Sequence, residues 1–105
     1  MKHLVLIIIS LLLLAQPAFA SAIFEPRRLE LLHLLKHDCG SCHGLSLKGG
    51  LGPPLTPANL RDKPVDFLSA TILYGRTGTP MPPWRPFLTD SEAKWLAERI
   101  KAGLK

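Results

Sequence analysis

The feature that most constrains this chain is the pentapeptide Cys39-Gly40-Ser41-Cys42-His43, which has the form C-x-x-C-H. Two thiols at this spacing can add to the two vinyl groups of one porphyrin, and the adjacent imidazole then lies beneath the iron. The motif therefore predicts one covalently attached haem c. Cys39 and Cys42 are the expected thioether residues, and His43 is the expected proximal ligand of the iron.

Two other interpretations of C-x-x-C have less support. A zinc site needs four ligands, and neither a second C-x-x-C nor an H-x-x-x-H follows downstream. A thioredoxin-like dithiol site needs a βαβ context, but no strand-like alternation surrounds these residues. A disulfide or dithiol pair is the main alternative to haem attachment.

Residues 1–20 are predicted to be a cleaved secretory signal peptide. Lys2 gives a positive start, residues 4–15 form an apolar run, and Ala18-Phe19-Ala20 has the A-x-A form of a cleavage site. The apolar run is shorter than the ~20 residues that span a bilayer, so we expect cleavage, with an uncleaved anchor as the alternative. Because bacteria attach haem c after export, the expected location is the periplasm.

Residues 21–105 are expected to form a single domain. A domain this short buries only about 60% of its unfolded surface, and a tethered haem would add a large apolar plate to its core. Removal of Lys2 from the 13 Lys and Arg leaves 12 against 8 Asp and Glu, a charge of +4. This scattered excess fits docking to an acidic redox protein and disfavours a nucleic-acid partner. We expect a monomer with no membrane span after cleavage.

Three helices and no strands are expected, which makes the fold class all-α. The first helix follows Pro26 and runs into the haem motif. Its predicted apolar face consists of Leu29, Leu31, Leu32, Leu34 and Leu35. The second helix is predicted from Pro64 to Tyr74, before Gly75 as a stop signal.

The last helix has the clearest start signal, because Thr89 and Glu92 match a capping box. Its predicted apolar positions are Ala93, Leu96, Ile100 and Leu104. Between the helices, the glycines and prolines of residues 44–61 predict a loop along one side of the haem. The four prolines of residues 75–87 predict an extended segment.

Met81 is the candidate for the sixth iron ligand. It is the only methionine of residues 21–105, and it lies 38 residues after His43 among four prolines. A lone methionine is often core filler, but a rigid proline-rich segment can hold one thioether at a fixed height above a plane. A thioether ligand also raises the reduction potential relative to two histidines. His33 and His37 are the other possible ligands, but they precede the motif and are expected at the surface.

These elements, in this order, resemble the class I c-type cytochromes from about Arg28 to Gly103. The resemblance rests on the helix before C-x-x-C-H, the loop Gly52-Pro53-Pro54-Leu55, the segment from Gly75 to Met81-Pro82 and the capped last helix. It implies a class I cytochrome c-like fold with about three helices and long loops around one haem.

The same resemblance implies two contacts. The first and last helices of the family cross near the haem edge, which implies packing of Leu31, Leu32 and Leu35 against Leu96 and Ile100. The carbonyl of the family's G-P loop accepts a hydrogen bond from the proximal imidazole, and Pro53 matches that position.

Shorter stretches are similar to the small cytochrome c-55X group of denitrification gene clusters. These are residues 39–45, residues 48–55 and Gly-Thr-Pro-Met-Pro-Pro-Trp at residues 78–84. The similarity implies periplasmic electron donation to cytochrome cd1 nitrite reductase, or electron supply during maturation of haem d1. Trp84 and Arg85 are candidate partners of a haem propionate, and the alternative is that Trp84 packs in the core and Arg85 is solvated.

If His43 and Met81 fill both axial positions, the iron has no open site for a substrate. We therefore expect an electron-transfer protein, not an enzyme, with redox proteins as partners. The alternatives are a haem enzyme or gas sensor with a displaceable Met81, an assembly factor for haem d1, and a dithiol oxidoreductase.

Overall fold

The computed structural model describes residues 1–4 and 22–104. Most of the predicted leader, residues 1–20, therefore lies outside the described residues. The helical elements are α2 (Glu25–Leu34), η1 (Leu35–Cys39), α3 (Gly40–His43), α4 (Pro57–Leu60), α5 (Val65–Tyr74) and α6 (Asp90–Ala102). These ranges contain no strand, so the all-α prediction is confirmed. Within them, no helix is both long enough and apolar enough to cross a membrane.

The first predicted helix is confirmed as a continuous helical rod made of α2, η1 and α3. Pro26 lies in its first turn, where a missing N–H is tolerated. The middle part, η1, is a π-helix in which the N–H of Gly40 bonds to the carbonyl of Leu35. The apolar spacing of the sequence gives no sign of this wider turn, which is of a kind often found at functional sites.

The apolar face of this rod is narrower than predicted. Leu31 and Leu35 are 0% and 2% exposed, and Leu34 is partly buried. The prediction is wrong for Leu29 and Leu32, which are 66% and 36% exposed. Leu31 and Leu35 are four residues apart and share one side of the helix, whereas Leu29 and Leu32 fall on another side.

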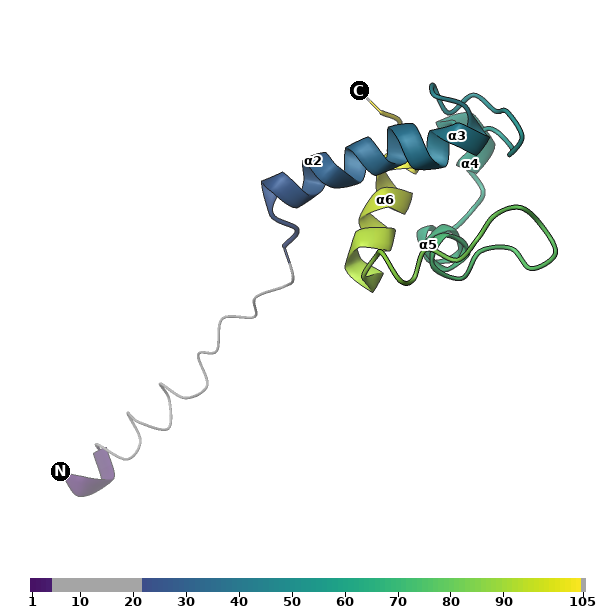
Figure 1. Ribbon diagram of the computed structural model, residues 1–105. Coiled ribbons are helices and arrows are strands. Elements are labelled where there is room, and N and C mark those ends of the chain that lie inside the picture. The colour runs from purple at the N-terminus through teal and green to yellow at the C-terminus, as the bar shows by residue number, and fades with distance from the viewer. Residues whose placement is uncertain (5–21, 105) are drawn as a thin grey trace.

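The core forms where the first helix, α5 and α6 meet. In Figure 1, α2 crosses α6, and α5 lies beside α6. The buried cluster consists of Leu31, Leu35, Leu47, Leu60, Leu68, Leu73, Leu88, Ala93, Leu96, Ala97 and Ile100. Leu31 and Leu35 share this cluster with Leu96 and Ile100, as the predicted packing of the first and last helices requires, whereas Leu32 is not part of it. The prediction for Leu104 is also wrong, because α6 ends at Ala102 and leaves Leu104 46% exposed.

The start of α6 is fixed by its predicted capping box, which is confirmed. The Thr89 hydroxyl accepts from the N–H of Glu92 at 3.2 Å, and the Glu92 carboxylate accepts from the N–H of Thr89 at 2.9 Å. Arg27 of α2 also donates to this carboxylate, with its Nε 2.7 Å from Oε1. One carboxylate therefore caps α6 and ties it to α2.

Both predicted loops contain more structure than the sequence suggested. Residues 44–61 include the short helix α4, whose N-terminus is capped by Thr56. Residues 75–87, the long green loop between α5 and α6 in Figure 1, are not simply extended. The N–H of Thr79 bonds to the carbonyl of Arg76 at 3.1 Å, and that of Phe87 to Trp84 at 2.9 Å. Prolines remove only their own donors, so the residues between them still form turns.

Candidate haem site

A single apolar cavity brings the chemistry-bearing residues of the sequence together. It has a volume of about 620 Å³ and is bordered by the first helix, α5, α6 and the loops between them. Cys39, Cys42, His43 and Met81 all line it. The volume lies within the ~300–1,000 Å³ of typical cofactor sites. Two thiols, one imidazole and one thioether around an apolar space are the donor set that a haem c requires, so the cavity fits this group.

The orientation of His43 is set by one hydrogen bond. Its Nδ1 lies 2.7 Å from the carbonyl oxygen of Pro53. A carbonyl only accepts hydrogen bonds, so the proton must be on Nδ1. The other ring nitrogen, Nε2, is then left with the lone pair that a metal needs.

The loop after the motif packs directly against this imidazole. The N–H of Gly52 bonds to the carbonyl of Cys42 at 2.7 Å, and the N–H of Gly49 bonds to the carbonyl of His43 at 2.8 Å. A Cβ at position 52 would lie 2.8 Å from Cε1 of the His43 ring, which is too close for any side chain. Gly52 is therefore required by the approach of the imidazole to the loop.

No disulfide joins Cys39 and Cys42. Burial, followed by the nearby carboxylate of Asp38, raises the pKa of Cys39 to about 11. This pKa applies only to the chain before haem attachment, because a thioether sulfur has no proton to lose. Both side chains reach the cavity from the C-terminal end of the first helix, where α3 presents Cys42 and His43 next to each other.

Met81 is held by its own backbone. Its carbonyl accepts from the N–H of Arg76 at 3.2 Å, and its N–H donates to the hydroxyl of Thr79 at 3.3 Å. The turn closes against Gly75, which ends α5 with a φ of +67°, and a Cβ there would lie 2.7 Å from the Met81 carbonyl oxygen. Only glycine combines this backbone conformation with so close a contact. The thioether therefore sits on a fixed turn.

The structure brings only one of the two residues proposed for the propionates to the cavity. Trp84 lines the cavity and packs against Phe87, with ring centroids 5.8 Å apart. Arg85 does not line it; its guanidinium forms an ion pair with Asp90 at the start of α6. The pair raises the pKa of Arg85 through the hydrogen bond to that carboxylate.

One lysine and one arginine line the cavity, and neither was predicted from the sequence. They are Lys63, just before α5, and Arg76, just after it. The available signal was the position of Arg76, between the helix stop Gly75 and Met81.

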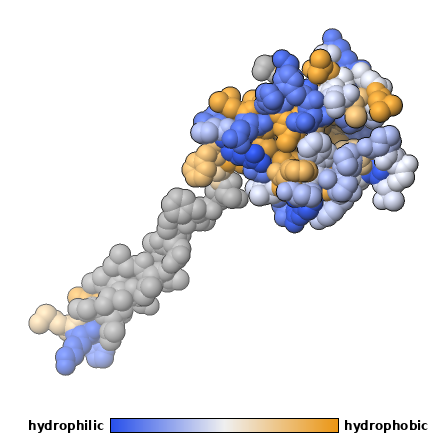
Figure 2. Space-filling view, in the orientation of Figure 1, coloured by the Kyte–Doolittle hydropathy of each residue, from blue (hydrophilic) through white to orange (hydrophobic). Residues whose placement is uncertain are grey.

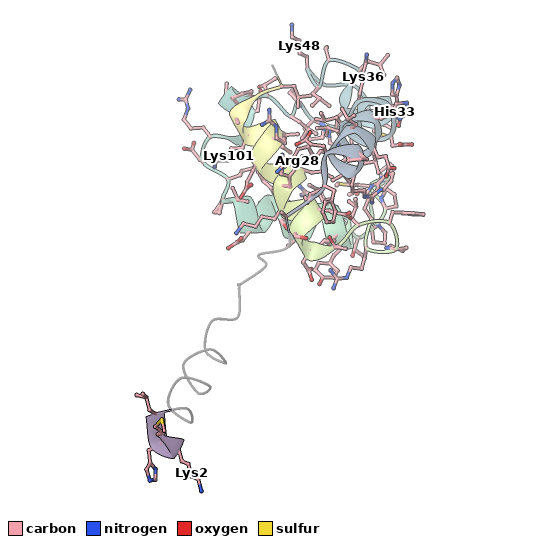
Figure 3. The ribbon with its side chains drawn as sticks, turned by 90° about the vertical axis from the view of Figure 1, so that its left-hand side faces the viewer. Lys2, Arg28, His33, Lys36, Lys48 and Lys101 are labelled. Carbon is pink, nitrogen blue, oxygen red and sulfur yellow. The ribbon has the colours of Figure 1, made fainter. Side chains whose placement is uncertain are left out.

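His33 and His37 do not line the cavity. Both are exposed on the first helix, with ring centroids 4.3 Å apart, and Figure 3 shows His33 and the nearby Lys36 pointing away from the domain. In the part of the chain that the structure describes, no three His, Cys, Asp or Glu side chains gather into a metal site. Of the candidate axial ligands, the fold brings His43 and Met81 to the cavity.

Comparison with known proteins agrees with this geometry. A family model described as "Cytochrome C oxidase, cbb3-type, subunit III" matches residues 29–98. Proteins named cytochrome c55X from Pseudomonas aeruginosa, Paracoccus denitrificans and Stutzerimonas stutzeri are 57%, 50% and 48% identical over 77, 90 and 86 residues. These matches cover 73%, 86% and 82% of this chain, and 65%, 87% and 76% of those proteins. The chain thus spans just under two thirds of the Pseudomonas aeruginosa protein.

Two solved structures are also similar. "C-type cytochrome NirC" matches with a TM-score of 0.75 and 54% identity over 76% of this chain and 94% of its own. "Dihydro-heme d1 dehydrogenase NirN in complex with DHE" matches with a TM-score of 0.62 and 31% identity over 67% of this chain and 15% of its own.

The fold, the cavity and these similarities define a c-type cytochrome, so the expected class I cytochrome c-like fold is confirmed. The chain belongs to the cytochrome c55X family. It is an electron-transfer protein, and its cofactor is a covalently bound haem c.

Proposed function

We propose that this cytochrome is a periplasmic one-electron carrier of denitrification that donates electrons to cytochrome cd1 nitrite reductase. The observation that supports this most is the cavity that joins the C-x-x-C-H motif to Met81. Membership of the cytochrome c55X family supports the link to denitrification. The predicted signal peptide supports the periplasmic location, which cell fractionation and an intact mass beginning at Ser21 would test.

Four residues hold the cofactor in this proposal. Cys39 and Cys42 would form the thioether bonds, and His43 and Met81 would bind the iron. The haem supplies a one-electron Fe(III)/Fe(II) cycle. The protein keeps both ligands in place, because the Pro53 carbonyl fixes the imidazole and the Arg76–Thr79 turn fixes the thioether.

With both ligands bound, the iron would have no open position, and electrons would pass to a partner by outer-sphere transfer. We expect a small docking surface of less than about 1,200 Å², which is typical of redox complexes. The charges on the domain suit a short-lived complex. Figure 3 shows Lys36 and Lys48 toward the top of the domain and Lys101 on its left side. Figure 2 shows apolar and polar patches mixed on the face that it presents. Dispersed cations of this kind orient an acidic partner without locking it in place.

Stopped-flow mixing tests the proposal. Reduced cytochrome is mixed with oxidised cytochrome cd1 nitrite reductase, and an unrelated c-type cytochrome of similar potential is the control. We expect faster transfer than with the control and a rate that falls as salt rises, because salt screens the attraction between the partners. Transfer no faster than with the control would contradict the pairing.

The similarity to NirN favours one second candidate, electron transfer during maturation of haem d1. NirN is named as a dehydrogenase of dihydro-heme d1, and 67% of this chain matches part of it. If this role applies, deletion of the gene leaves nitrite reductase protein in the periplasm without finished haem d1. Nitrite reductase with a normal haem d1 content in the deletion strain would exclude it.

A further inference from the structure

The haem c of this protein carries two propionate carboxylates, and the structure shows which cations are near enough to meet them. Lys63 and Arg76 are the only lysine and arginine residues, among those described, that line the cavity. The single carboxylate that lines it belongs to Asp38, next to Cys39. A negative group inside the cavity therefore has two possible cationic partners.

Arg76 is fixed beside Met81 at both of its backbone groups. Its N–H bonds to the Met81 carbonyl at 3.2 Å, and its carbonyl accepts from the N–H and the hydroxyl of Thr79 at 3.1 and 2.7 Å. Arg76 and Thr79 also line a second, open groove of about 320 Å³ on the outer side of this turn. The backbone of Arg76 is thus fixed, and the exposed residue borders both the haem cavity and the open groove.

The guanidinium of Arg76 has no carboxylate partner within the described residues. The ion pairs there use Arg27, Arg28 and Arg85. Arg85, the residue that the sequence suggested for this role, is already paired with Asp90. A planar guanidinium that is always charged and can make two parallel hydrogen bonds suits a carboxylate.

Lys63 is the weaker candidate of the two. It precedes α5, at the end opposite to the Met81 turn, and its Nζ lies 5.6 Å from the centre of the Phe67 ring. Its ammonium therefore already has an aromatic neighbour. It also lacks the planar pair of donors with which a guanidinium binds a carboxylate.

We propose that the guanidinium of Arg76 binds a haem propionate and raises the reduction potential of the iron. An uncompensated carboxylate near the iron stabilises Fe(III), and a paired guanidinium cancels part of that effect. It also keeps the propionate ionised, so that reduction occurs without uptake of a proton. This inference rests on the bound haem c and not on the identity of the redox partner.

Spectroelectrochemical titration of the purified holoprotein, from about pH 5 to about pH 9, tests this role. The variants are Arg76→Gln, Arg76→Lys, Arg85→Gln and Lys63→Gln. Lys94→Gln is the control, because it removes the same charge from an exposed position on α6 that does not line the cavity. The titration uses mediator dyes and no partner protein, so its failure leaves the proposed transfer to nitrite reductase intact.

We expect Arg76→Gln to shift the equilibrium with a mediator about three- to tenfold toward oxidised protein, where tenfold corresponds to 59 mV for one electron. Its potential also becomes pH-dependent, because the unpaired propionate takes up a proton on reduction. Arg76→Lys gives a smaller shift in the same direction. A purely structural role would not create the pH dependence.

Three results would overturn the assignment. The first is an Arg76→Gln potential and pH profile that match those of Lys94→Gln. The second is a lowered, pH-dependent reduction potential in Arg85→Gln or Lys63→Gln but not in Arg76→Gln. The third is used if Arg76→Gln fails to retain haem. In that case, an Arg76→Lys potential equal to that of the wild type would overturn the assignment.

Discussion

The Nδ1–H of His43 donates to the carbonyl oxygen of Pro53 across 2.7 Å. The bond connects the haem motif to a loop ten residues further along the chain, and it leaves Nε2 free for the iron. Because the bond makes the imidazole a more basic ligand, the loop influences the iron through His43.

Gly52 should be the least replaceable residue of that loop. In Gly52→Ala the new Cβ would lie 2.8 Å from the His43 ring, so either the loop or the imidazole must move. We expect lower haem incorporation and a loss of about 1–3 kcal/mol in the free energy of unfolding of the holoprotein. The haem-to-protein absorbance ratio and urea unfolding measure the two effects.

Gly78→Ala is the matched control for this substitution. A Cβ there meets no atom within 4 Å, although the φ of +78° adds backbone strain. The absorbance ratio should stay at the wild-type value, with a modest loss of stability. Equal haem loss in both variants would mean that contact with His43 is not the cause.

Glu92 should make folding sensitive to acid. The hydrogen bond from Arg27 lowers the pKa of Glu92 below its ordinary value of 4.5. A depressed carboxyl pKa adds stability above the unfolded-state pKa, and this stability is lost as the pH falls through the folded-state pKa. We expect Glu92→Gln to lose about 1.5–3 kcal/mol at neutral pH. The variant should also lose less stability than the wild type as the pH falls below 4.5.

Glu98→Gln controls for the charge change, since Glu98 is an exposed residue of α6. Its unfolding curves at neutral and acid pH should follow the wild type closely. The account of the Arg27–Glu92 contact fails if the two glutamine variants have the same pH dependence of unfolding.

Leu31 and Leu29 should differ sharply although they lie two residues apart. Leu31 is fully buried, and Leu29 is 66% exposed. Neither side chain lines the haem cavity, so haem binding does not confound the comparison. We expect Leu31→Ala to lower the free energy of unfolding by about 2–5 kcal/mol. Leu29→Ala should change it by less than about 0.5 kcal/mol, and equal losses would place the core elsewhere.

Much of the fold and the site could be predicted because the signals were local. Pro26, the Thr89–Glu92 box and Gly75 marked helix ends that the structure has at or next to the predicted positions. The C-x-x-C-H motif at residues 39–43 indicates the haem attachment residues directly. Met81 was indicated by its proline neighbours and by being the only methionine of residues 21–105.

The errors came from features that depend on tertiary structure. The apolar spacing alone predicted that Leu29 and Leu32 are buried. The core lies on the side of the first helix that carries Leu31 and Leu35. Proximity in sequence to Met81 favoured Arg85, but the turn at residues 76–79 brings Arg76 to the cavity, and the start of α6 supplies Asp90 to Arg85. Neither relationship is visible before the chain is folded.

Carbon monoxide binding to the ferrous protein at neutral pH tests the central claim most directly. A haem whose axial positions are filled by His43 and Met81 has no site for the gas, so the wild-type spectrum should not change. Met81→Ala removes the thioether and should bind carbon monoxide stoichiometrically. Rapid stoichiometric binding to the wild-type protein, or a Met81→Ala protein whose spectrum matches the wild type, would contradict the account.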